Sequence, residues 1–132
     1  MSWLFIDTTR PDAFRYGLLS TKTSRVFVMK GRSRGLLPAI DRRYDQVDLK
    51  KLKGICVVHG PGSFSAVRGG VIVANLLARL LRKPLVGVDC TEATDLETLA
   101  KNLEAGKKSA SSYVMPTYDA EPNITMSACP TP

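Results

Sequence analysis

The feature that most constrains this chain is a junction between two apolar segments, residues 55–58 and 67–81. The first is short and rich in β-branched residues, which is typical of a buried strand. The second contains no proline and is too long for a strand, so it predicts a helix. Between them, Gly60-Pro61-Gly62 allows a sharp turn, because glycine accepts positive φ and proline fixes φ. The junction therefore predicts a strand, a tight turn and a helix.

The start of this predicted helix has two interpretations. Ser63 or Ser65 can act as the N-cap, with its hydroxyl accepting a hydrogen bond from a free helix N–H. Backbone N–H groups at the same place could instead meet an anion. A P-loop is excluded, because the Gly-Lys-Ser/Thr element is absent and Arg68 lies at the wrong spacing. On physical grounds a capped turn is the simpler interpretation, and the anion site stays open.

The predicted helix carries more apolar surface than one sheet can cover. At about 100° per residue, its polar residues fall into one narrow stripe, which contains Arg68, Asn75, Arg79 and Arg82. A helix on a sheet needs only one apolar stripe, and this helix has nearly two. One flank contains Val67, Val71, Ala74, Ala78 and Leu81, and the opposite one contains Val73, Leu77 and Leu80. We expect the second flank to meet another helix, of this chain or of a partner. The sequence does not decide which flank faces the sheet.

Length and composition indicate one globular domain, since 132 residues leave room for a core. No apolar run approaches the roughly 20 residues of a membrane span, so no membrane partner is expected. The N-terminus lacks the charged and apolar regions of a signal peptide. Cys56, Cys90 and Cys129 are odd in number and lack metal spacing, which predicts reduced thiols in a cytoplasmic protein. No metal and no cofactor are expected.

The positive charge is concentrated in residues 22–53. This segment has ten Lys and Arg side chains against three Asp, which accounts for the whole net charge of +7. Such an excess could attract nucleic acid or an acidic protein surface. A solvated basic face kept for solubility explains it equally well. No interleaved aromatic residues favour base stacking.

The remaining segments complete an α/β fold class with a mixed five-stranded sheet and flanking helices. Strands are predicted at 3–6, 14–20, 25–30, 55–58 and 85–88, and helical segments at 36–44, 48–53, 67–82 and from Thr91 or Thr94 to about Glu104. Gly106 closes the last helix. We expect one lobe at residues 1–106, followed by a linker and extended tail at 107–132.

This order and four motifs resemble the N-terminal lobe of the TsaB (YeaZ-like) family, over roughly residues 3–104. The motifs are Ile6-Asp7-Thr8-Thr9, Leu36-Leu37-Pro38-Ala39-Ile40-Asp41, Gly60-Pro61-Gly62-Ser63-Phe64-Ser65-Ala66-Val67-Arg68-Gly69-Gly70 and Pro84-Leu85-Val86-Gly87-Val88. Pro116-Thr117-Tyr118 is similar to the Pro-x-Tyr near the C-terminal end of such proteins. TsaB proteins are bacterial partner proteins in the synthesis of tRNA threonylcarbamoyladenosine, from the actin/sugar-kinase/Hsp70-like superfamily. The resemblance implies a single actin-like, RNase H-like lobe.

The departure from the family concerns size, because TsaB-like proteins normally have a second lobe. In the superfamily, nucleotide lies between two lobes. The resemblance thus implies at most half of a phosphate site, a vestigial one formed by Asp7, Thr8, Gly60, Gly62 and Ser63. We therefore expect no ATP chemistry by this chain alone.

The resemblance also implies a non-catalytic role. TsaB pairs with the related TsaD, which transfers threonylcarbamoyl to adenosine 37 of tRNA, and a TsaE-like ATPase is a further implied partner. The family's pairing surface is built from the two helices that correspond here to 36–44 and 67–82, and a homodimer through the same helices stays open. The partner-binding residues expected here are Leu36, Leu37, Ile40, Val71, Ala74, Leu77, Ala78 and Leu81. Contact with tRNA within the complex also stays open.

Two further functions are alternatives. One is a nucleotide- or RNA-binding module that uses the basic segment. The other is a peptidase-like enzyme, suggested by His59 near Ser63. His59 is the only histidine and no His-Glu-x-x-His occurs, while a serine nucleophile needs an oriented base. No catalytic residue is therefore predicted.

Overall fold

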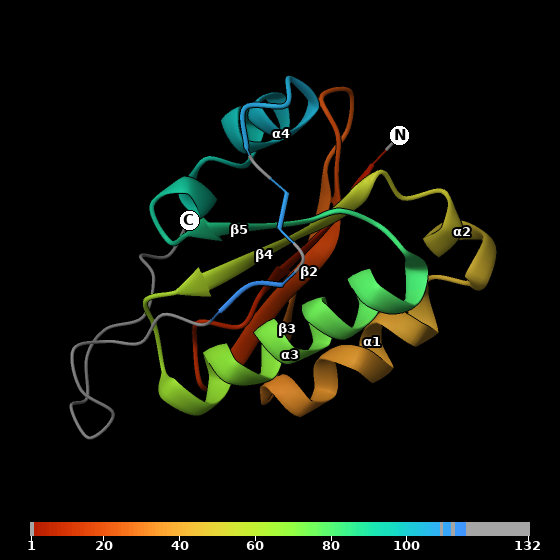
Figure 1. Cartoon of the computed structure of the whole chain (residues 1–132). Coiled ribbons are helices and arrows are strands. Elements are labelled where there is room, and N and C mark those ends of the chain that lie inside the picture. The colour runs from red at the N-terminus through yellow and green to blue at the C-terminus, as the bar shows by residue number, and fades with distance from the viewer. Residues whose placement is uncertain (1, 109, 112, 116–132) are drawn as a thin grey trace.

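The computed structural model describes residues 2–108, 110–111 and 113–115 (Figure 1). Its strands are β1 (Trp3–Asp7), β2 (Ala13–Leu19), β3 (Arg25–Lys30), β4 (Gly54–Gly60) and β5 (Leu85–Asp89). Its α-helices are α1 (Leu36–Arg43), α2 (Gln46–Lys50), α3 (Phe64–Leu81) and α4 (Leu96–Glu104). Two short 3-10 helices, η1 (Ser33–Gly35) and η2 (Glu92–Thr94), precede α1 and α4.

The strands form one mixed sheet in the order β3-β2-β1-β4-β5. β1, β2 and β3 are an antiparallel meander, and β1, β4 and β5 are parallel to one another. The predicted fold class, a mixed five-stranded sheet with flanking helices, is therefore confirmed.

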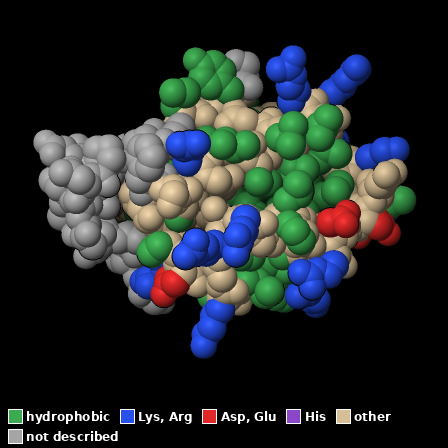
Figure 2. Space-filling view, turned by 90° about the horizontal axis from the view of Figure 1, so that it is seen from below, with side chains coloured by type: hydrophobic (Ala, Val, Ile, Leu, Met, Phe, Trp, Pro, Cys, Tyr) green, Lys and Arg blue, Asp and Glu red, His purple; other side chains and the backbone are tan. Residues whose placement is uncertain are grey.

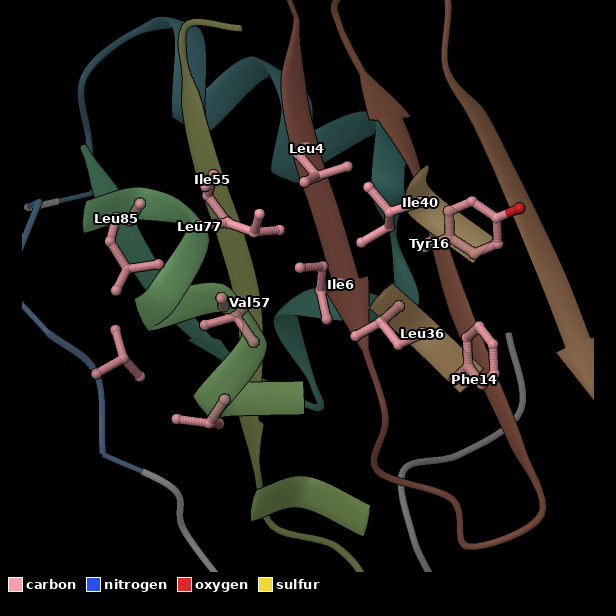
Figure 3. Packing of buried hydrophobic residues seen from close by; sticks show 14 of the residues in the cluster. Leu4, Ile6, Phe14, Tyr16, Leu36, Ile40, Ile55, Val57, Leu77 and Leu85 are labelled. Carbon is pink, nitrogen blue, oxygen red and sulfur yellow. The ribbon is translucent and has the colours of Figure 1, made fainter. Parts of the chain in front are cut away.

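Helices cover both faces of the sheet, with α1 and α3 on one side and α4 on the other (Figure 1). Successive strand residues point to opposite faces, so Leu4 and Ile6 enter the core under α1 and α3, while Trp3 and Phe5 enter the core under α4. Figure 3 shows the first of these cores, where strand residues such as Leu4 and Ile55 meet Leu77 of α3. Burial on both faces explains why the central strands are continuous apolar runs.

Three predicted helix starts differ from the structure. α3 begins at Phe64 instead of residue 67, and local capping explains the other two. α2 begins at Gln46, because the Asp45 side chain accepts from the Asp48 backbone N–H and Asp48 reciprocates at Asp45. α4 begins at Leu96, because the Asp95 carboxylate accepts from the Thr98 N–H at 3.1 Å. Thr91 instead precedes the short η2 turn.

The structure bears on the prediction of reduced thiols at Cys56. Cys56 is free and fully buried, and burial raises the pKa of its thiol to about 12. Cys90 is also buried, and the prediction for its thiol stays a prediction. Within the described residues no helix has the length and apolarity that crossing a membrane requires. A cytoplasmic location stays a prediction.

The division into a lobe and a tail also stays a prediction. Residues after Glu104 contact the lobe, since Ser111 pairs with Leu85 in an isolated bridge and Val114 is buried. The Pro116-Thr117-Tyr118 motif lies outside the described residues.

Candidate functional site

The parallel strands β1 and β4 end side by side, which brings the predicted phosphate-site residues together. The Ser63 N–H donates to the Thr9 carbonyl at 3.1 Å. A Cβ at Gly62 would lie 2.8 Å from that same carbonyl oxygen, so only glycine permits this close approach. The turn has positive φ at Gly60, as expected for a glycine turn.

The Asp7 carboxylate in this corner is fully engaged within the protein. One oxygen accepts from Arg15 Nε and Nη2 at 3.0 and 2.7 Å. The other accepts from the backbone N–H and hydroxyl of Thr9 at 3.0 and 2.7 Å. Side-chain exposure is only 7% for Asp7 and 11% for Arg15. The residue expected to take part in phosphate binding therefore forms a buried ion pair.

Thr8 and the start of α3 likewise contact each other. The Thr8 hydroxyl donates to the Ala66 carbonyl at 2.6 Å. Gly70 fits against this hydroxyl, since a Cβ there would lie 2.1 Å from it. Ser63 occupies the predicted N-cap position, but its side chain makes no capping hydrogen bond. The phosphate site stays a prediction, and these contacts fill the corner with the protein's own groups.

His59 lies half-buried near the end of β4, beside Gly87 of β5. The described residues contain no group of three His, Cys, Asp or Glu side chains that could hold a metal ion. These observations leave the absence of catalysis an expectation.

Most of the predicted partner-binding side chains face the chain's own core. The six buried ones are Leu36, Ile40, Val71, Ala74, Leu77 and Ala78. Leu81 is half-buried, and Leu37 is 40% exposed. Both apolar flanks of the predicted helix thus contribute to the sheet-facing side, because α1 packs beside α3. Partner binding by these residues stays a prediction.

Another set of α3 residues forms the exposed apolar surface. Ile72, Leu76 and Leu80 are spaced four residues apart, and their exposures are 55%, 46% and 68%. We name these three the α3 stripe. Figure 2 views this side of the molecule and shows hydrophobic side chains gathered there, with Lys and Arg around them. The i, i+4 spacing from Arg68 onward is visible in the sequence, but the two predicted flanks include neither Ile72 nor Leu76.

Asn75 of α3 is not simply a solvated polar residue. Its side-chain amide donates to the Val114 carbonyl at 2.9 Å and accepts from the Val114 N–H at 2.8 Å. The chain segment after α4 thereby covers one margin of α3. The α3 stripe lies on the part of the helix that this segment leaves exposed.

The sheet order and the two helix-covered faces define an actin-like, RNase H-like lobe. The family model of TsaD, tRNA N6-adenosine threonylcarbamoyltransferase, matches residues 28–118. Because this match spans more than half of the 132 residues, the chain belongs to the TsaD family.

Solved structures point to the TsaB-like branch that the sequence motifs predicted. YeaZ, a TsaB-type protein, from Pseudomonas aeruginosa is 26% identical with a TM-score of 0.59, over 67% of this chain and 45% of that chain. A protein with similarity to peptidase YEAZ, also from Pseudomonas aeruginosa, gives 26% and 0.59, over 67% of this chain and 43% of its own. The chain thus spans less than half the length of these proteins. No curated protein matches it significantly.

Proposed function

We propose that the chain is a non-catalytic partner of a TsaD-type threonylcarbamoyltransferase that modifies adenosine 37 of tRNA. The observation that carries this proposal is the α3 stripe. Exposed apolar side chains grouped on one helix mark a protein-binding surface more often than scattered single residues do. Leu37 on the adjacent α1 adds a further exposed apolar side chain.

The identity of the partner is supported by the family match and by the likeness to YeaZ. A non-catalytic role is supported by the closed corner, where Asp7 is held by Arg15 and Thr9. In this proposal the enzyme supplies the reacting groups and this chain stabilises the enzyme. A TsaE-like ATPase is the further partner that the same system would include.

The test is isothermal titration of the chain with a TsaD-type enzyme. Leu76→Glu and Ile72→Glu each place a charge on the α3 stripe, where association would bury it unpaired. We expect the Kd to rise about 100-fold or more in each variant. Val28→Glu is the matched control, because Val28 is 67% exposed on the edge strand β3. Its Kd should stay within about threefold of wild type, a difference of under about 1 kcal/mol.

Circular dichroism establishes that each variant is folded before the titration. Wild-type affinity in both folded stripe variants would reject the α3 stripe as the interface. Light scattering of the chain alone tests the homodimer: self-association lost in Leu76→Glu would indicate that two copies use the same surface.

A further inference from the structure

Three adjoining hollows lie along β3, η1 and α1, on the basic segment of the chain. The first, of 740 Å³, is lined by Pro11, Asp12, Gly31, Arg32, Ser33, Arg34, Ser65 and Ala66. The second, of 400 Å³, shares Gly31, Arg32 and Arg34 with it. The third, of 430 Å³, shares Met29 and Arg42 with the second. Because neighbouring hollows share lining residues, the three adjoin one another along this surface, and we refer to them together as a groove.

Cationic side chains dominate this groove. Five of them line it: Lys30, Arg32, Arg34, Arg42 and Arg43. Among the described residues that line it, the one carboxylate belongs to Asp12. We call the surface that these five cations line the basic groove. Lys50 and Lys51, although part of the same basic segment, belong to none of the hollows.

Most of these charges are available to a ligand. Lys30, Arg32, Arg34 and Arg42 are exposed. Among the described residues, none of these four forms an ion pair. Arg42 makes one long hydrogen bond, from Nε to the Pro38 carbonyl at 3.4 Å. The groove therefore concentrates positive charge that the described residues do not neutralise.

Arg43 is positioned before any ligand arrives. Its Nε donates to the Tyr16 hydroxyl at 3.0 Å, and its guanidinium lies 3.7 Å above the Phe27 ring centre. The side chain is nevertheless exposed. A guanidinium held in this way loses less conformational entropy on binding than a free one does.

We propose that the basic groove binds the phosphodiester backbone of RNA. Four of its five cations are arginines, whose planar fork matches phosphate oxygens in two-point hydrogen bonds. The charges follow a path through three hollows, which suits a polymer with one charge at every residue. An acidic protein surface is the other polyanion, and the experiment distinguishes it. The inference rests on the proposed function for the identity of the RNA as a tRNA.

The experiment measures binding of an anticodon stem–loop RNA to the full chain by fluorescence anisotropy across a range of NaCl concentrations. We expect Arg32→Glu/Arg34→Glu to weaken binding at least tenfold at low salt. The slope of log K against log salt should also fall by about 1.4 to 1.8, since each lost phosphate contact removes about 0.7 to 0.9. Both residues are exposed, so the double variant is expected to fold.

The matched control is Lys50→Glu/Lys51→Glu, which makes the same change of net charge in the same segment but outside the groove. Equal losses in both double variants would show that net charge alone drives binding, and would overturn the proposal. Displacement of the RNA by poly-glutamate at equal charge concentration would overturn it in favour of an acidic protein surface.

This test is independent of the enzyme partner, because RNA binding is measured on the chain alone. Loss of RNA binding in a groove variant that still pairs with the TsaD-type enzyme supports both proposals. Unchanged RNA binding in that variant rejects the groove and leaves the proposed pairing intact. Failure of the wild-type chain to pair, with groove-dependent RNA binding, rejects only the proposed function.

Discussion

α3 and α4 cover opposite faces of the same sheet, but their outer surfaces differ. α4 buries Leu99, Ala100 and Leu103, while its outer Glu97 and Lys101 form an ion pair at 3.5 Å. Glu104 at its end accepts hydrogen bonds from the Thr21 hydroxyl and N–H, which lower the pKa of its carboxyl.

α3 buries a comparable inner side but leaves the α3 stripe exposed. The inner sides of both helices therefore explain the fold, whereas only their outer sides can distinguish a helix that faces solvent from one that faces a partner. Under the proposed function, the outer side of α4 stays exposed to water, whereas the α3 stripe is covered by a partner.

The largest expected effect separates the inner and outer sides of α3. Ala74 is completely buried, so Ala74→Glu places an unpaired charge in the core and should cost several kcal/mol, enough to prevent folding. Leu76→Glu adds the same charge at an exposed position and should change the free energy of unfolding by under about 1 kcal/mol. Urea unfolding followed by circular dichroism measures both. Similar losses in the two variants would contradict the assignment of the two sides.

A smaller effect is expected from the buried Asp7–Arg15 ion pair, which lies on the α4 side of the sheet. Arg15 donates to Asp7 and to the Ala93 carbonyl, and lies over the Phe5 ring. Arg15→Ala leaves the Asp7 charge buried without its partner and should lower the free energy of unfolding by about 3–5 kcal/mol.

The control for this change is Lys101→Ala, which breaks the exposed pair with Glu97 and should cost about 0.5 kcal/mol or less. Chemical denaturation of both variants gives the comparison. If the two losses are equal, the Asp7–Arg15 pair does not stabilise the fold.

An effect that is absent at neutral pH and appears only above pH 9 concerns the core beneath α4. Burial raises the pKa of Cys56 from its ordinary 9.0 to about 12. Below pH 9 the thiol is protonated in both states, so its contribution to stability is fully present there. Above pH 9 the unfolded chain loses this proton while the folded chain keeps it, so stability falls by about 1.4 kcal/mol per pH unit until pH 12.

Cys56→Ala removes this contribution, so its stability should fall less steeply than that of wild type between pH 9 and 11. Denaturant unfolding at several pH values measures the difference. Parallel pH profiles for the two proteins would show that the Cys56 thiol is not the group that titrates.

The sequence predicted the sheet well because its central strands are buried on both faces and therefore stand out as apolar runs. The sequence did not predict which side chains of α3 are exposed. Leu77 is buried because α1 packs beside α3, and no local pattern encodes this packing. The Asp7–Arg15 pair depends on strand register, since these residues lie directly opposite each other on β1 and β2. That register becomes apparent only when the meander is formed.

The capping errors have a local cause. Asp45 and Asp95 each have a Thr or Asp nearby that could also serve as the N-cap, and the sequence alone does not rank these candidates. The basic segment was visible in the sequence, but its division into groove and non-groove cations required the placement of η1 against α3 and α1.

Hydrogen–deuterium exchange on the chain, alone and with a TsaD-type enzyme, tests the central claim that α3 is completed by a partner. The account predicts that binding slows amide exchange across residues 68–82 and leaves exchange in α4, residues 96–104, unchanged. Slowed exchange in α4 with no change in α3 would contradict it, because the polar helix rather than the apolar one would then meet the enzyme.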